Sequence, residues 1–254
     1  MLITLIGTGN VANALGIAFF EAGHVINQVY GRKKEVAKKL ARKLNSEETD
    51  NLEKLKPGSD VYLFCVSDDA IETVANKILL KNIFCVHTSG AMPMNVLQKF
   101  IHNGVIYPLQ TISAKRKINF KDVPVCIEAN DKTNEIKLKD LAKSISDNVH
   151  HINSEQRLYL HLAAVFANNF TNSLYSDAAN LLEDYNLPFR FLHPLILETA
   201  LKAIEFDPRK VQTGPAVRFD RDTIKKHMQL LEFYPELKKS YQLLSKQIQQ
   251  QHKN

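Results

Sequence analysis

The first dozen residues place the strongest constraint on the fold. An apolar run at residues 2–6 leads directly into the pattern Gly7-x-Gly9-x-x-Ala12. The run is typical of a buried strand, and the residues from Asn10 onward are typical of a helix start. Gly7 permits a tight turn, Gly9 lets a pyrophosphate approach the backbone, and Ala12 lets helix pack on strand. The pattern predicts a dinucleotide-binding turn whose helix N-terminus faces the phosphates. The alternative is a structural turn that binds nothing.

Strand and helix patterns alternate over the first 152 residues. This alternation predicts an α/β fold, a Rossmann-type doubly wound and mostly parallel sheet. Strands are expected at residues 2–6, 24–30, 60–66, 83–87, 105–107, 123–128 and 149–152. Helices are expected at residues 10–21, 34–44, 69–79, 93–101 and 131–145.

Strand patterns stop after Asn153, and long helical periods follow. Helices are expected at residues 154–185, 189–204 and 220–233 and from Pro235 onward, with Ser154 as the first N-cap. We therefore predict two domains, a nucleotide-binding domain at 1–152 and an all-helical substrate and dimerisation domain at 153–254. An apolar stripe on the last helix supports a homodimer through this second domain; its members are Leu237, Tyr241, Leu244 and Ile248.

Composition narrows the class of protein. The chain is 44% hydrophobic, enough for a sizeable core, and its net charge of +6 comes from scattered cations. Scattered cations favour solvated helix faces over a nucleic-acid surface. The three cysteines lie in apolar runs without metal-ligand spacing, which predicts buried free thiols in a reducing compartment and no metal. No apolar run is long enough for a membrane span, so a cytoplasmic protein without a membrane partner is expected.

The end of the second predicted strand indicates the type of cofactor. NAD-binding proteins place an acidic residue about 20 positions after the glycines, where it binds the ribose 2′-hydroxyl. Here Gly31 is followed by Arg32, Lys33 and Lys34, with no acid. Arg32 could form paired hydrogen bonds with a 2′-phosphate and stack on adenine. This favours NADP; the alternative is that these cations are only the exposed start of a helix.

Three polar loops follow strand ends, where sheets of this kind bind ligands. They begin at Ser67, His87 and Tyr107. We expect all three to line the site, with Ser67, Thr88 and Ser89 near the nicotinamide, although turn formation and helix capping would use the same residue types. The predicted cofactor-binding residues are Gly7, Thr8, Gly9, Asn10, Val11, Ala12, Gly31, Arg32, Lys33, Val66, Ser67, Thr88 and Ser89.

A polar stripe interrupts the long apolar helix expected at residues 154–185. On an ideal helix His161, Asn168 and Asn172 fall within about 40° of one another. Such groups need partners, because burying them unpaired costs about 1–3 kcal/mol each. We predict His161 as a catalytic proton donor or substrate anchor and Asn168 as the residue that orients the substrate. The alternative is an internally satisfied network.

A second polar segment lies near the C-terminus, around a Gly-Pro turn at residues 214–215. Arg218 could bind a substrate carboxylate through two hydrogen bonds. Asp220 and His227 share a helix face, although Asp220 would also serve as an N-cap. With Ser89, these three residues form the predicted substrate-binding set.

Five segments occur in an order that resembles a known family. They are Gly7-Thr-Gly-Asn-Val-Ala12, His87-Thr-Ser-Gly90, Pro108-Leu-Gln-Thr111, His161-Leu-Ala-Ala-Val-Phe-Ala-Asn-Asn169 and Thr213-Gly-Pro-Ala with Arg218-Phe-Asp220 and His227. Over essentially its whole length the chain resembles bacterial NADP oxidoreductases with an N-terminal Rossmann domain and a helical DUF2520 domain. More distantly it resembles pyrroline-5-carboxylate reductase, F420-dependent NADP oxidoreductases and the 6-phosphogluconate dehydrogenase-like superfamily. The resemblance implies a helical domain that forms dimers and closes a cleft over the nicotinamide.

Two departures from the family pattern limit what the resemblance implies. Tyr107 stands where the pattern has His, and the long helix carries no Lys, the residue that β-hydroxyacid dehydrogenases use there. The main hypothesis is an NADP-dependent oxidoreductase acting on a small anionic substrate. One alternative is an inactive, dinucleotide-sensing regulatory protein, and another is an enzyme with F420 as hydride partner.

Overall fold

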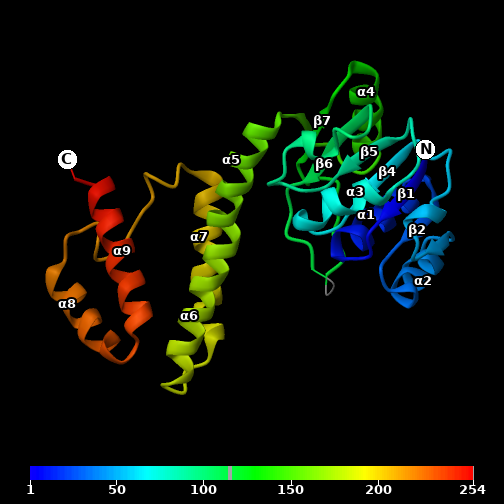
Figure 1. Ribbon diagram of the computed structural model, residues 1–254. Helices are drawn as coiled ribbons and strands as arrows, with labels where there is room; N and C mark the ends of the chain where they lie inside the picture. Colours follow the sequence, from blue (N-terminus) through cyan, green and yellow to red (C-terminus); the bar gives the residue numbers. More distant parts are fainter. Residues whose placement is uncertain (114–115, 254) are drawn as a thin grey trace. The chain divides into compact units, whose positions relative to one another are not determined.

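The computed structural model describes residues 1–113 and 116–253. They form two compact units, Met1–Asn169 and Phe170–Asn254. The first unit contains the sheet and the helices that cover it, and the second contains helices throughout its described part (Figure 1). The α/β prediction, with an all-helical region after it, is confirmed.

One eight-stranded sheet forms the centre of the first unit, in the order β3-β2-β1-β4-β5-β6-β7-β8. Every neighbouring pair is parallel except β6 and β7. The first six strands have the order typical of dinucleotide-binding sheets. The strands are β1 (Leu2–Ile6), β2 (Val25–Tyr30), β3 (Glu47–Thr49), β4 (Val61–Phe64), β5 (Phe84–His87), β6 (His102–Pro108), β7 (Val125–Ala129) and β8 (Val149–His151).

Four helices lie between strands in the described chain and pack on the sheet, and α5 follows the last strand. These helices are α1 (Asn10–Glu21), α2 (Lys34–Lys43), α3 (Ile71–Lys77), α4 (Lys132–Lys143) and α5 (Ser154–Ala164), with 3₁₀ turns at Leu52–Lys54, Asp68–Ala70 and Met94–Leu97. The helix expected at 93–101 is wrong: only the turn at Met94–Leu97 forms there. Strand β3 was not predicted, because its sequence Glu-Glu-Thr lacks an apolar run.

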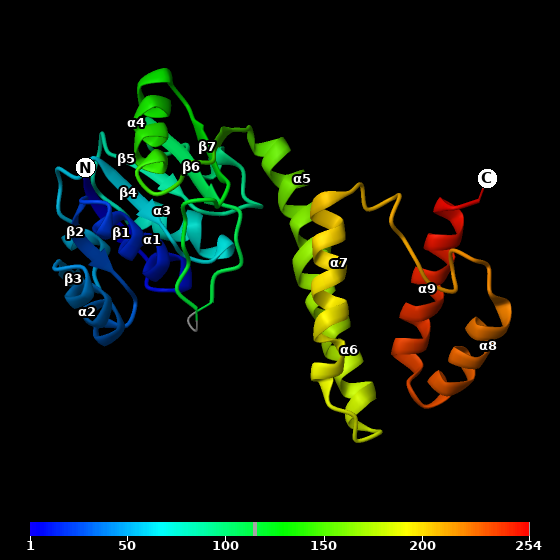
Figure 2. The same cartoon turned by 180° about the vertical axis from the view of Figure 1, so that it is seen from behind.

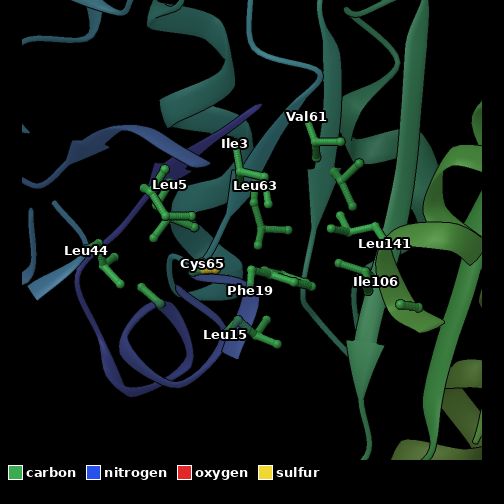
Figure 3. Packing of buried hydrophobic residues seen from close by; sticks show 14 of the residues in the cluster. Ile3, Leu5, Leu15, Phe19, Leu44, Val61, Leu63, Cys65, Ile106 and Leu141 are labelled. Atoms are coloured by element: carbon green, nitrogen blue, oxygen red, sulfur yellow. The ribbon is translucent and has the colours of Figure 1, made fainter. Parts of the chain in front are cut away.

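Alternating strand residues build the core on both faces of the sheet. In β4, Val61 and Leu63 belong to one apolar cluster, whereas Tyr62 and Phe64 belong to the other. Successive side chains of a strand point to opposite faces, and a strand covered on both faces is apolar throughout. Figure 3 shows the first cluster, in which Phe19 of α1 lies near Leu63 and Cys65. All three cysteines are buried free thiols, as predicted.

In residues 170–253 the second unit contains four helices and two 3₁₀ turns; Figure 2 shows these helices from behind. The helices are α6 (Thr171–Glu183), α7 (His193–Glu205), α8 (Arg221–Leu230) and α9 (Pro235–Gln251), with 3₁₀ turns at Phe189–Leu192 and Leu231–Phe233. The long helix predicted at 154–185 is α5 and α6 joined by a π-helical segment, Val165–Phe170. Pro194 lies in the first turn of α7, where its missing N–H costs no helical hydrogen bond.

The start of α5 corrects one detail of the prediction. Its N-cap is Asn153, not Ser154. Asn153 and Gln156 form a reciprocal capping box, with Gln156 N donating to Asn153 Oδ1 at 2.8 Å and Asn153 N donating to Gln156 Oε1 at 3.0 Å. Ser154 is committed elsewhere, because its N–H and hydroxyl both bind the Glu128 carboxylate.

The division into compact units falls later than the predicted boundary between residues 152 and 153. That boundary marks the change from strands to helices, whereas the first compact unit continues to Asn169. The extension has a physical cause: the buried Arg157 side chain pairs with Glu128 of β7, which ties the first turns of α5 to the sheet. The functional division at 152–153 stays a prediction.

Candidate nucleotide and substrate site

The turn between β1 and α1 depends on two glycines for different reasons. Gly7 has φ +126°, and a Cβ atom there would lie 2.3 Å from the Cys65 carbonyl oxygen, so no side chain fits. Gly9 has open space where a Cβ would be. It is the N-cap of α1, and this fully described helix has no side-chain cap and no acidic residue in its first turn. The N–H groups at this end are therefore available to an anion such as a pyrophosphate.

A cleft of about 330 Å³ opens beside this turn. Gly31 lets the turn pack closely on the end of β2, because a Cβ there would lie 2.5 Å from Thr8 Cγ2. An adjoining hollow is lined by Thr8, Arg32, Lys33 and Val36. The predicted cofactor residues that line the cleft or the hollow are Gly7, Thr8, Gly9, Gly31, Arg32, Lys33, Val66 and Ser67.

The cations at the end of β2 are free to bind a phosphate. Arg32 and Lys33 are exposed, and neither takes part in an ion pair with another described residue. Burial raises the pKa of Tyr30, the positive Arg32 opposes the rise, and the negative Asp50 adds to it. Asp50 directly follows β3, and no motif in the sequence marks it. The two cations fit a dinucleotide with a 2′-phosphate, whereas the nearby Asp50 carboxylate opposes one.

Three predicted residues of the first turn of α1 have other roles. The Asn10 side chain donates to the Ile112 carbonyl at 3.4 Å and lines a different hollow. Ala12 is fully buried and Val11 packs against the core, so these two position the helix. Only their backbone N–H groups face the helix terminus that would hold phosphate.

Thr88 and Ser89 also use their hydroxyls within the protein. Thr88 Oγ1 donates to the Phe64 carbonyl at 3.2 Å. Ser89 Oγ accepts from the N–H groups of Ala91 at 3.1 Å and Met92 at 2.9 Å. The alternative of turn formation accounts for both hydroxyls, and their contact with a cofactor or substrate stays a prediction.

A second hollow, of about 510 Å³, contains both predicted catalytic residues. The end of β6 and the residues after it form one wall, and α5 with the π-helical segment forms the other. His161 and Asn168 line it, as does Tyr107, whereas Asn172 belongs to the second unit. The π-helical segment adds a residue to the turn, so the ideal-helix angles used for the stripe do not hold there.

Tyr107 and His161 form a pair that the sequence did not predict. Tyr107 Oη lies 3.1 Å from His161 Nδ1, and the two rings meet edge to face with centroids 6.1 Å apart. Gly90 makes the pair possible, because a Cβ there would lie 2.8 Å from His161 Nδ1 and 2.8 Å from Tyr107 Cζ. Residues from β6, α5 and the loop after β5 thus meet at one point.

A buried ion pair holds α5, which forms one wall of the hollow lined by His161. Arg157 is 1% exposed and pairs with Glu128. Its guanidinium also donates to the Met92 carbonyl at 2.6 Å and to Ser154 Oγ at 3.2 Å. Burial, and then the positive Arg157, lower the pKa of His87 to about 3, so His87 is neutral and its Nδ1 accepts the Ser89 N–H. Two features of the sequence could have indicated the ion pair. Arg157 is a charged residue within the helical pattern of α5, and Glu128 is an acid at the end of an apolar strand.

The remaining predicted substrate residues lie in the second unit. Asp220 is the N-cap of α8 and accepts from Thr223 N at 3.0 Å, a hydrogen bond that holds its pKa below the ordinary value. His227 Nδ1 lies 2.9 Å from Tyr241 Oη. Both contacts are structural, whereas Arg218 takes part in none of the ion pairs among described residues. Substrate binding by these three residues stays a prediction.

The fold and the nucleotide cleft are those of a dinucleotide-binding protein of the Rossmann type. Residues 2–89 match the family model "NADP oxidoreductase coenzyme F420-dependent", and residues 123–248 match the DUF2520 domain of unknown function. A putative NADP oxidoreductase from Bacteroides fragilis is 41% identical, with 98% of each chain covered and a TM-score of 0.90. The chain belongs to this NADP oxidoreductase family with a DUF2520 region. The predicted enzyme class and NADP as cofactor are confirmed.

More distant structures share the fold. A protein from Thermotoga maritima is 24% identical, with 98% of each chain covered and a TM-score of 0.75. The 1-pyrroline-5-carboxylate reductase of Streptococcus pyogenes is 14% identical, with the same coverage and a TM-score of 0.64. No curated protein matches the sequence. None of the helices in the described residues is long and apolar enough to cross a membrane.

Proposed function

We propose that this NADP-dependent oxidoreductase transfers hydride between nicotinamide and a small anionic substrate that binds beside His161. The sheet topology carries the proposal. The turn after β1, the loop after β4 and Tyr107 near the end of β6 lie at one edge, because β1, β4, β5 and β6 are parallel. Asp68, next to Ser67 of the cleft, acts electrostatically on Tyr107 of the second hollow. The cleft and the hollow are therefore neighbours at the edge where such sheets bind ligands.

Each predicted residue has a chemical role in this proposal. The bound nicotinamide supplies or accepts the hydride. His161 donates a hydrogen bond or a proton to the reacting heteroatom, and Asn168 orients the substrate in the same hollow. No Lys or Arg lines that hollow among the described residues. Substrate binding by Ser89, Arg218, Asp220 and His227 stays a prediction, with Arg218 as the residue able to bind a carboxylate through two hydrogen bonds.

A regulatory protein that binds the dinucleotide without turnover is the second candidate. The observation that favours it is the absence of Lys from residues 154–185, since related dehydrogenases use Lys on this helix. Turnover separates the two candidates. We expect the protein to oxidise NADPH with at least one member of a panel of ketoacids, aldehydes and imines. His161→Ala should lower kcat by about 10²–10⁴-fold, because a positioned proton donor contributes about that much.

His150→Ala is the matched control, since His150 is exposed on β8 and outside the hollow. It should leave kcat unchanged. Tight NADPH binding without turnover of any compound would instead support the regulatory protein. Turnover by wild type that His161→Ala leaves intact would remove His161 from the mechanism.

We further propose that the helical unit forms a homodimer. Among its described residues only Ala216 and Leu231 are buried apolar side chains. Many large apolar side chains are exposed: Leu174, Tyr185, Leu187, Phe191, Leu195, Leu197, Leu201, Ile204, Phe206, Phe219, Leu230, Phe233, Leu243 and Leu244. An apolar surface of this extent favours a protein partner, and a second copy of the chain supplies a complementary one.

Light scattering should give about twice the chain mass of 28.9 kDa at micromolar concentration. Ile204→Glu, which places a charge at an 80% exposed position of α7, should shift the protein toward monomer. Ile101→Glu, at a 68% exposed position of the first unit, is the control and should stay dimeric. A monomeric wild-type protein would contradict the proposal.

A further inference from the structure

The two nitrogens of His161 have different surroundings. Tyr107 and Gly90 close the edge that carries Nδ1, through the 3.1 Å contact with the Tyr107 hydroxyl and the close approach of Gly90. Nε2 takes part in none of the hydrogen bonds found among the described residues, and the ring lines the 510 Å³ hollow. One nitrogen is thus fixed by the protein and the other is free for a ligand.

The Tyr107 hydroxyl keeps its proton over the physiological pH range. Burial raises the pKa of Tyr107, and the Cys126 thiol and the Asp68 carboxylate raise it further, while the Arg157 guanidinium opposes them. These groups come from β7, the turn after β4 and α5, and His161 also contacts the Tyr107 hydroxyl. A protonated hydroxyl can donate to an imidazole nitrogen that carries no proton, and the 3.1 Å contact places the Tyr107 hydroxyl within hydrogen-bond distance of Nδ1.

We propose that Tyr107 is a positioning residue that donates to Nδ1 of neutral His161 and so holds the imidazole proton on Nε2, facing the substrate. The inference rests on the proposed function, since it specifies how His161 acts in that reaction. A neutral imidazole N–H can polarise a carbonyl without carrying a charge. Fixing the tautomer through the other ring nitrogen is a general way to orient a histidine.

The tautomer restricts the reacting group of the substrate. An Nε2–H donor needs a lone pair opposite it, which a carbonyl oxygen or an unprotonated imine nitrogen provides and a protonated iminium does not. The hollow suits a neutral group, because its described lining holds alanines, Leu109, Val165 and amides but no Asp, Glu, Lys or Arg. The reacting end is therefore a neutral carbonyl or imine, whatever charge the rest of the molecule carries.

Nitrogen NMR of the ¹⁵N-histidine-labelled full chain tests the tautomer without a substrate. At alkaline pH, where an ordinary imidazole is neutral, wild type should show the His161 proton on Nε2 and a hydrogen-bonded acceptor at Nδ1. His161→Gln assigns the resonances by their loss. Tyr107→Phe keeps the ring but removes the hydroxyl, so the Nδ1 signal should move to the value of an unbonded acceptor. Gly90→Ala should do the same, because its methyl group would lie 2.8 Å from Nδ1.

Tyr159→Phe is the matched control, since Tyr159 is exposed on the same helix and should leave the His161 signals unchanged. A proton on Nδ1 in wild type, or a Tyr107→Phe spectrum identical to wild type, overturns the inference. NADPH binding should be equal in wild type and Tyr107→Phe, which shows that the variant is folded. If the tautomer is as expected but no compound is reduced, the proposed function fails while the positioning of His161 stands. If the protein reduces a compound but carries the His161 proton on Nδ1, the proposed function stands and the positioning by Tyr107 fails.

Discussion

Replacing Glu128 by Gln is expected to lower the free energy of unfolding by about 3–5 kcal/mol. The carboxylate pairs with Arg157, which is 1% exposed, and it also accepts from the N–H and hydroxyl of Ser154. Without the negative charge the guanidinium stays buried and uncompensated, and that cost exceeds the value of the hydrogen bonds that Gln can still accept. The loss should appear as an earlier midpoint in urea or guanidinium unfolding.

Glu47→Gln is the matched control, because Glu47 pairs with Lys56 at the surface, where the two side chains are 67% and 41% exposed. Such a pair contributes less than about 1 kcal/mol. Replacing both members of the buried pair, in Glu128→Leu with Arg157→Leu, should recover most of the stability, since no unpaired charge remains. Equal small losses for the two Gln variants would show that the buried pair does not anchor α5.

Most of the fold follows from local patterns that a sequence displays directly. The apolar runs that became β1, β4 and β5 are covered on both faces, so their identity as strands needs no tertiary information. Strand β3 escaped prediction because a short polar strand at the sheet edge is defined by its pairing with β2. The expected helix at 93–101 failed for a related reason: Ser89, Arg157 and Ser154 bind the backbone around Met92 and Met94 and set its path.

The residues of the site likewise fall into those that the local sequence predicts and those that only the tertiary structure brings together. The glycines of the first turn and the cations after β2 act through backbone geometry and local charge, so their positions in the sequence suffice to place them. The pairs Tyr107–His161 and Glu128–Arg157 join residues far apart in the chain. Nothing local distinguishes Tyr107 from any tyrosine at the end of a strand. Its role emerges only when β6, α5 and Gly90 are brought together.

Replacing Arg32 by Ala is expected to weaken NADPH binding by about 10–100-fold, since hydrogen bonds to charged groups contribute about 1.5–3 kcal/mol and 1.4 kcal/mol is tenfold in affinity. Arg32 lines the nucleotide cleft and the adjoining hollow that holds Lys33, and no ion pair among described residues occupies its guanidinium. NADH lacks the 2′-phosphate, so its affinity should change by less than about threefold. Calorimetric titrations at one fixed ionic strength measure both.

Two further variants separate a specific phosphate contact from general electrostatics. Arg42→Ala removes a cation of the same type from an exposed position of α2, outside the hollow that Arg32 and Lys33 line. It should leave the affinities for NADPH and NADH unchanged. Asp50→Asn tests whether the carboxylate that acts on Tyr30 binds a ribose hydroxyl. Two results together would contradict the selectivity for NADP: wild type binds NADH as tightly as NADPH, and Asp50→Asn loses affinity for NADH. If the 2′-phosphate sits beside Arg32, removing a nearby negative charge should instead strengthen NADPH binding, because like-charge repulsion is relieved.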